Sequence, residues 1–197
     1  MKEILKKIFR FPQNMIDGLS NLYGLKRWRV NYDASLKLYG KVYISGKGIE
    51  LGKYVQINSG YRYNPIGGDE RTILRTQGSG RIQIGAHTGI SNASIVAYRS
   101  VSVGEYVLLG GSCKIYDTDF HSLSADIREK QPDKDIAAKP VVIKDHAFIG
   151  AHTIILKGVT IGEGSVIGAG SVVTKSVPDG EIWAGNPAVF IRKVETK

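Results

Sequence analysis

The dominant pattern of the sequence is an aliphatic residue that returns at every sixth position between residues 143 and 177. The aliphatic positions are Ile143, Ile149, Ile155, Ile161, Ile167 and Val173. Four places after each comes a small or short residue, at Ala147, Thr153, Val159, Ser165, Ser171 and Val177. A period of six fits neither an amphipathic helix nor one long alternating strand. It is typical of a parallel β-helix, in which each hexapeptide forms one side of a triangular coil and directs its aliphatic side chain inward.

The same period is present upstream, which extends the predicted β-helix over most of the chain. The upstream aliphatic positions are Leu51 and Ile57, then Ile84, Ile90 and Val96, then Val103, Leu109 and Ile115. We therefore predict an all-β domain over residues 36–177, with its first coil starting near Val42. A partly helical lead-in segment over residues 1–35 precedes it, and a C-terminal tail over residues 178–197 follows it.

Two segments break the period and are predicted to leave the coil as loops. Residues 58–81 contain Pro65 and several glycines, and we interpret them as an excursion with a hairpin strand over residues 72–76. Residues 117–142 are polar and charged. Because a long loop on a rigid scaffold is frequently functional, we expect the second loop in particular to contribute to a site.

Residues 1–11 have the pattern of a short basic amphipathic helix, which Pro12 is predicted to end. Its apolar positions are Ile4, Leu5, Ile8 and Phe9, with basic residues between them. Two roles are open for this helix. It can pack on the open end of the β-helix or on a neighbouring subunit, or it can make a weak contact with an anionic membrane surface.

The composition is that of a soluble globular protein, with 42% hydrophobic and 23% charged residues in 197. A net charge of +9 favours an anionic partner such as a nucleotide-like cofactor, a nucleic acid or a membrane surface. We expect no nucleic-acid binding, because no recognised motif accompanies the charge. The chain lacks an apolar run of about 18 residues and the pattern of a signal peptide. A cytoplasmic location follows as the expectation, with a peripheral position at the inner face of the membrane left open.

Cys113 is the only cysteine, so no disulfide within the chain is available. It falls four places after Leu109, in the slot that the repeat reserves for a small inward residue. We therefore predict that the Cys113 thiol fills the core and is not a nucleophile.

Three of the four histidines, His87, His146 and His152, each come three places after an inward aliphatic residue, which predicts that they face solvent. His146 and His152 are one hexapeptide apart, so they lie on different sides of the triangle. They cannot share a metal ion within one subunit, so we expect no metal site, although a zinc ion between subunits stays open.

The fourth histidine, His121, lies where the chain leaves the repeat for the second loop. An imidazole titrates near neutral pH and can take a proton from a hydroxyl and return it. A nearby carboxylate can fix its tautomer, and both Asp117 and Asp119 are candidates. The pattern Asp-x-His alone is weakly specific, so a structural role for this histidine also stays open.

Taken together, the hexapeptides, the stretch Asp117-Thr118-Asp119-Phe120-His121, the loop after it and the tail Ala184-Gly185-Asn186-Pro187-Ala188 closely resemble hexapeptide-repeat acyltransferases. The nearest branch is that of the sugar and polysaccharide O-acetyltransferases of the galactoside, maltose and capsule-biosynthesis type. The resemblance covers about residues 40–194. It implies a homotrimer of left-handed parallel β-helices, with acetyl-CoA as the co-substrate in the groove between adjacent subunits.

The resemblance also implies roles for individual residues. His121 would be the general base, with Asp119 beside it, and Asn92 and Asp117 would bind the acceptor. The cofactor-binding residues would be Phe148, Gly150, Ala151, Gly168, Ala169, Thr174, Lys175 and Arg192. Two departures from the galactoside branch stand out: Phe148 replaces a tryptophan beside the cofactor arm, and Val189 replaces an arginine of the tail. The acceptor implied is a sugar hydroxyl of a cell-surface glycan or of its lipid-linked precursor.

Three other functions compete with sugar O-acetylation. A sugar N-acetyltransferase would use the same histidine toward an amine. A metal-dependent hydratase of the γ-carbonic anhydrase type would need three converging histidines, which the predicted outward directions oppose. A non-catalytic trimeric scaffold would release no thiol from acetyl-CoA.

Overall fold

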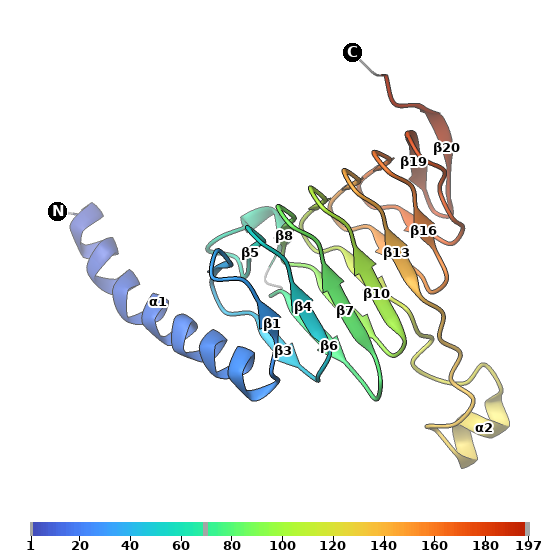
Figure 1. The fold of residues 1–197 in the computed structure, drawn as a ribbon, viewed down its shortest axis with the longest axis horizontal. Coiled ribbons are helices and arrows are strands. Elements are labelled where there is room, and N and C mark those ends of the chain that lie inside the picture. Colours follow the sequence, from blue (N-terminus) through green and yellow to red (C-terminus); the bar gives the residue numbers. More distant parts are fainter. Residues whose placement is uncertain (1, 69–70, 196–197) are drawn as a thin grey trace.

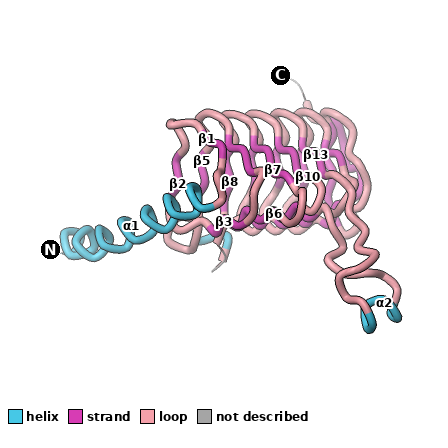
Figure 2. Tube along the Cα trace, turned by 60° about the horizontal axis from the view of Figure 1, so that its bottom comes forward, coloured by secondary structure: helices cyan, strands magenta, loops and turns pink. Residues whose placement is uncertain are grey.

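Three parallel sheets form the sides of a prism in the computed structural model (Figure 1). The structure describes residues 2–68 and 71–195, and within the N-terminal helix it describes side chains from Gln13 onward. The parallel β-helix expected from the period, with the left hand implied by the family resemblance, is confirmed. Successive strands of one coil belong to three different sheets, and each strand pairs in parallel with its equivalent in the next coil. A helix stands at the N-terminal end, and a long loop projects from the side (Figures 1 and 2).

The three sheets contain the following strands. The first sheet consists of β1 (Asn31–Tyr32), β4 (Ile49–Leu51), β7 (Arg81–Ile84), β10 (Ser100–Val103), β13 (Val141–Ile143) and β16 (Thr160–Ile161). The second consists of β2 (Lys37–Tyr39), β5 (Gln56–Asn58), β8 (Gly89–Ser91), β11 (Leu108–Leu109), β14 (Phe148–Ile149), β17 (Val166–Ile167) and the terminal antiparallel pair β19 (Glu181–Gly185) and β20 (Ala188–Lys193). The third consists of β3 (Tyr43–Ser45), β6 (Ile73–Thr76), β9 (Ser94–Ala97), β12 (Lys114–Tyr116), β15 (Ile154–Ile155) and β18 (Val172–Val173).

Each coil has three corners, which we number in chain order. The first corner joins the first sheet to the second, the second corner joins the second sheet to the third, and the third corner leads into the next coil. Both large loops leave from corners. Residues 59–72 extend the second corner between β5 and β6, and residues 117–140 extend the third corner between β12 and β13. The first of these loops contains a 3₁₀ turn over Pro65–Gly67. The second contains the helix α2 (Ala125–Lys130).

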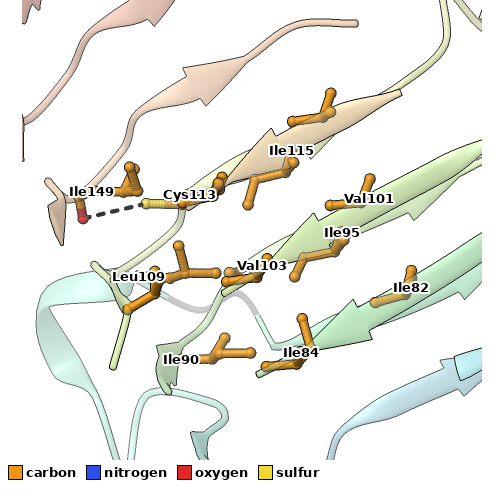
Figure 3. Packing of buried hydrophobic residues seen from close by; sticks show 14 of the residues in the cluster. Ile82, Ile84, Ile90, Ile95, Val101, Val103, Leu109, Cys113, Ile115 and Ile149 are labelled. Atoms are coloured by element: carbon orange, nitrogen blue, oxygen red, sulfur yellow. Dashed lines mark hydrogen bonds between the residues drawn. The ribbon is translucent and has the colours of Figure 1, made fainter. Parts of the chain in front are cut away.

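The core is a column of aliphatic side chains along the axis of the prism. All six aliphatic residues of the dominant repeat are fully buried, and the small residues four places later are buried beside them. Figure 3 shows the same arrangement in the preceding coils, where Ile84, Ile90 and Ile95 stack below Val103, Leu109 and Ile115. The inward positions predicted from the period are therefore confirmed, except at Val96. Ile95 takes that place, because it pairs with the inward Ile115 and belongs to the core, whereas Val96 pairs with Tyr116. The period thus slips by one residue before β9, earlier than the sequence suggested.

Glycine at the corners permits the close stacking of successive coils. At Gly150, a Cβ atom would lie 2.5 Å from the backbone nitrogen of Ala169 in the next coil. That distance is far below van der Waals contact, so any side chain at this position would push the coils apart. The glycine after the inward aliphatic residue thus follows from backbone crowding.

Cys113 is confirmed as a core residue, since its side chain is fully buried between Leu109 and Ile115 (Figure 3). Its Sγ atom lies 3.2 Å from the carbonyl oxygen of Gly150 and can donate a weak hydrogen bond to it. Burial raises the pKa of the thiol to about 11 from its ordinary value of 9.0. The thiol is therefore neutral and shielded in the folded protein.

We expect Cys113 in the folded protein to resist a thiol reagent such as 5,5′-dithiobis(2-nitrobenzoate) at neutral pH and to react fully after denaturation in guanidinium. Because the pKa is raised in the folded state, the contribution of the neutral thiol to stability is complete below pH 9.0 and is lost as the pH rises toward about 11. Absorbance at neutral pH with and without denaturant measures the reactivity. Rapid labelling of the native protein would contradict the burial described above.

Two predicted boundaries are wrong. The first strand begins at Asn31 and pairs with Glu50, so the first coil starts before Val42 and before residue 36. Residues 73–76 form β6, which pairs in parallel with β3 and β9 and is not part of a hairpin. The first loop is therefore shorter than 58–81, because its later residues belong to the third sheet. Whether a segment of a few residues forms a strand depends on its pairing with the coils above and below, and the local sequence does not reveal that pairing.

The N-terminal helix α1 extends from Lys2 to Arg27 and passes through Pro12, so the prediction that Pro12 ends the helix is wrong. Proline removes one backbone donor, and the helix can continue where the flanking turns make their own hydrogen bonds. The predicted apolar face of residues 1–11 lies outside the described side chains. Neither helix in the described part of the chain is both long and apolar enough to cross a bilayer.

Packing of α1 on the first coil uses one face of its second half. Leu25 joins the hydrophobic core, and the side chains of Asp17 and Asn21 are buried. The Asn21 amide donates to the carbonyl oxygen of Gly40 at 2.9 Å and accepts from the amide of Val42 at 2.9 Å. The helix thereby satisfies backbone groups at the edge of the first coil, as a role at the open end of the β-helix requires.

Candidate active site

The second loop is held at its base by a short antiparallel ladder. A bridge joins Thr118 to Ala138, and the backbone amides of Asp119 and Lys139 donate to Ala137 and Asp117 across it. The ladder keeps the residues before His121 against the third corner. The residues beyond it project from the body (Figure 2).

The carboxylate of Asp117 holds the neighbouring coil. Its two oxygens accept hydrogen bonds from the backbone amides of Tyr98 and Arg99, at 2.7 and 2.6 Å, and the side chain is fully buried. Burial raises the pKa of this carboxyl above its ordinary value, and the two amide donors act in the opposite direction. The geometry gives Asp117 a structural role in this subunit. Its predicted contact with the acceptor stays a prediction.

Asp119 forms an ion pair with a residue that the sequence did not suggest. The Nζ atom of Lys157, on the third corner of the next coil, lies 2.6 Å from Oδ1 of Asp119. Oδ2 is buried and has no hydrogen-bond partner among the described residues. No hydrogen bond between Asp119 and His121 is present within residues 2–68 and 71–195. The predicted pairing of the two thus stays a prediction, and Oδ2 is the oxygen free to accept a donor.

His121 follows a residue that is clamped by aromatic contacts. Phe120 meets Tyr98 and Tyr116 edge-to-face, with ring centroids 6.0 and 5.1 Å apart, and its backbone is left-handed with φ of 63°. After His121, the guanidinium of Arg128 donates to the carbonyl oxygens of Ser122 and Leu123. The backbone on both sides of His121 is therefore fixed, and the imidazole itself is exposed.

Asn92 anchors the first loop. Its Oδ1 accepts from the amide of Gly60 at 2.7 Å, its Nδ2 donates to the carbonyl oxygen of Asn64 at 3.0 Å, and the side chain is fully buried. Asn92 lies at the second corner, at the opposite edge of the third sheet from the loop that carries His121. The side-chain oxygen and nitrogen of Asn92 are both bonded to the first loop, so acceptor binding by Asn92 also stays a prediction.

The predicted cofactor-binding residues fall on two separate edges of the subunit. Phe148 is exposed on the second sheet, and Gly150, Ala151, Gly168 and Ala169 lie at the adjoining second corner. Thr174 and Lys175 lie at the third corner, where they are exposed. Arg192 lies on β20, opposite Ile182 of β19. The structure therefore does not gather the predicted cofactor-binding residues on one edge of the subunit, and their role stays a prediction.

A hollow of about 460 Å³ lies beside Phe148 on the outer face of the second sheet. Gly89 produces it, because the strands on either side carry Gln56 and Leu108 at the equivalent outward position. The exposed side chains of Leu108 and Phe148 form its apolar wall. Such a surface can hold a slender apolar chain, as a pantetheine arm is.

The remaining histidines are exposed at the corners, as predicted. His87 and His146 are on the first corner, where they stack with Tyr54 and Tyr106 in the order Tyr54, His87, Tyr106, His146, with centroids 4.6–5.3 Å apart. His152 is on the second corner. Within the described ranges, no group of three histidine, cysteine or acidic side chains is arranged to hold a metal ion.

Sequence comparison matches residues 140–175 to the bacterial transferase hexapeptide model, which describes six repeats. The chain is 39% identical over 103 residues to a galactoside O-acetyltransferase of Lactococcus lactis, an alignment that covers 52% of this chain and 48% of that protein. It is 46% identical over 57 residues to a tetrahydropyridine-dicarboxylate N-acetyltransferase of Staphylococcus aureus, covering 29% and 24% of the two chains. The chain thus spans about half the length of the first curated relatives that it matches.

Structure comparison gives the same picture over a longer part of the chain. A hexapeptide-repeat acetyltransferase of Vibrio cholerae, solved in complex with acetyl coenzyme A, superposes with a TM-score of 0.52 at 25% identity, over 82% of this chain and 72% of that one. The resemblance to hexapeptide-repeat acyltransferases is therefore confirmed in both sequence and fold.

Proposed function

We propose that this chain, as a hexapeptide-repeat protein similar to sugar O-acetyltransferases, is an acetyl-CoA-dependent O-acetyltransferase that acts on a sugar hydroxyl. The observation that carries the proposal is the similarity to a galactoside O-acetyltransferase over 103 residues, together with the fold shared with a protein solved in complex with acetyl coenzyme A. The acceptor we propose is a glycan of capsule, O-antigen or exopolysaccharide biosynthesis, or its lipid-linked precursor, modified at the cytoplasmic face of the membrane.

In the proposed reaction, His121 is the general base. Its imidazole takes the proton of the acceptor hydroxyl as the oxygen attacks the thioester carbonyl. The new C–O bond forms, the C–S bond breaks, and the imidazolium returns its proton to the departing thiolate of coenzyme A. The clamped Phe120 and the Arg128 contacts support this role, because a general base must be held within hydrogen-bond reach of its substrate.

We also propose that the active site lies between two subunits of a homotrimer. The division of the predicted cofactor residues between two edges of the subunit supports this arrangement. Lys175 and Arg192 are exposed and would meet the phosphates of coenzyme A, for which basic side chains are suited. Phe148, Gly150 and Ala151 would line the apolar arm.

The test of the activity is release of free thiol from acetyl-CoA in the presence of a panel of sugars, nucleotide sugars and lipid-linked glycans. We expect release that depends on one class of acceptor, and a product whose acetyl group is removed by mild base, as an ester is. No release with any acceptor, together with no binding of coenzyme A, would overturn the proposal.

An N-acetyltransferase is the second candidate, favoured by the similarity to the S. aureus N-acetyltransferase. The same assay separates the two functions. An amide product survives the mild base that removes an ester, and the acceptors that respond would carry a free amine.

The proposed assembly predicts a sedimentation coefficient of a trimer for the full chain at micromolar concentration. Phe148→Glu should weaken the trimer or the binding of coenzyme A, because it places a charge on the apolar wall of the proposed groove. Ile66→Glu, at an exposed site on the first loop, is the control. A stable wild-type monomer that still transfers acetyl groups would contradict the shared site.

A further inference from the structure

The N-terminal helix α1 carries a broad apolar surface on the side that faces away from the β-helix. Met15, Ile16, Leu19 and Tyr23 form this surface, which we call the α1 stripe. Leu22 lies at its edge, is 41% exposed and lines a hollow against the first coil. Met15, Ile16, Leu19 and Tyr23 are 55%, 54%, 61% and 69% exposed. The spacing of its members repeats at three and four residues, so they share one side of the helix.

The β-helix does not cover the α1 stripe. Asp17, Asn21 and Leu25 face the first coil, and they lie on the opposite side of the helix from Leu19. Figures 1 and 2 both show α1 at the N-terminal end of the β-helix, with its first half extending beyond the body. Large apolar side chains grouped in this way on a surface indicate a binding site.

The net charge of the N-terminal segment indicates what binds to the α1 stripe. Residues 1–30 contain seven basic and two acidic residues, a net of +5 out of the +9 of the whole chain. One of the two acidic residues, Asp17, is buried against the body and accepts a hydrogen bond from Gln13. Two of the seven basic residues, Lys26 and Arg27, lie in the last turn of α1, and the guanidinium of Arg27 lies 4.8 Å from the centre of the Trp28 ring.

A second copy of the helix is a poor partner for such a surface. Antiparallel or parallel copies would bring basic segments together without acidic residues to pair with them. A bilayer with anionic lipids matches both properties, because the apolar side chains enter the acyl boundary and the basic residues meet the headgroups.

We propose that α1 is a membrane-surface helix and that the α1 stripe binds this protein to an anionic bilayer. The helix lies parallel to the membrane plane and does not cross it. This inference rests on α1 alone and is independent of the proposed acetyl transfer.

Co-sedimentation with vesicles tests the proposal on the full chain. The probes are vesicles of an equal mixture of phosphatidylglycerol and phosphatidylcholine, and vesicles of phosphatidylcholine alone. The wild type should bind the anionic vesicles, less tightly as salt is added, and should bind the neutral ones weakly or not at all. Met15→Glu combined with Leu19→Glu should weaken binding by about tenfold or more, since two apolar anchors are lost.

A matched variant controls for the added negative charge. Leu123→Glu combined with Val189→Glu changes the net charge equally at two exposed positions away from α1, on the second loop and on β20. It should bind anionic vesicles within about twofold of the wild type if the stripe is specific. Equal loss in both double variants would overturn the role of the stripe.

Two further results would overturn the proposal. One is the absence of wild-type binding to anionic vesicles. The other is a sedimentation coefficient that differs between the wild type and the Met15→Glu, Leu19→Glu variant while neither binds vesicles. The stripe would then be a contact between copies of the chain. Circular dichroism of the variant establishes that α1 is still helical.

Discussion

His121→Ala should lower the turnover of acetyl transfer by about 10²- to 10⁴-fold, the range that a positioned general base contributes. The loss should appear mainly in kcat, because the imidazole removes a proton during the chemical step. The sedimentation coefficient should stay that of the wild type, since the side chain is exposed on a loop. Initial rates of thiol release at saturating acetyl-CoA measure the effect.

Lys134→Ala is the control for changes in the same loop, because Lys134 is exposed and lies beyond α2. It should keep a rate close to that of the wild type. A near-normal rate for His121→Ala would remove the proposed mechanism while leaving the fold and the coenzyme A binding unaffected. Binding of coenzyme A to the His121→Ala variant, measured by calorimetry, separates these results.

Asp117→Ala should lower the free energy of unfolding by about 2–5 kcal/mol, because the backbone amides of Tyr98 and Arg99 would both lose their acceptor, the buried carboxylate. Asp117→Asn should also destabilise, since its amide retains one acceptor oxygen but turns an NH₂ group toward an N–H donor. Denaturation in urea measures both changes.

Asp117 is the position where structural and binding roles are most easily separated. An acceptor-binding residue would change KM for the acceptor and leave the unfolding transition in place. A variant with wild-type stability and a raised KM would restore the binding role expected from the family resemblance. A large loss of stability would instead identify Asp117 as the residue that fixes the third corner beneath His121.

The parts of the fold that repeat were readable from the sequence. The hexapeptide period identified the inward residues from Ile143 to Val173, and it placed His146 and His152 on different corners. These predictions were correct because every hexapeptide follows one rule: it directs an aliphatic side chain inward, places a small residue beside it and turns at a corner. The rule needs no knowledge of distant residues.

The candidate site was only partly readable. Asp119, His121 and Phe148 were identified from the family resemblance, but Lys157, Tyr98 and Arg128 were not. Lys157 meets Asp119 only because two coils stack, and its sequence position is that of an ordinary exposed lysine. A role for Arg128 near His121 could have been predicted, since it lies on α2 in the same loop. Its contacts, however, are with backbone carbonyls, which carry no sequence signal.

The sequence by itself determined the β-helix, its axis of buried aliphatic residues and the position of the loop with His121, because these follow from a local period. Only the tertiary structure decided that α1 passes through Pro12, that the first coil begins at Asn31, and that Asn92 and Asp117 are buried anchors. The start of the first coil and the two anchors depend on hydrogen bonds between residues far apart in sequence. Such partners become neighbours only when the coils stack, and a local pattern does not contain that information.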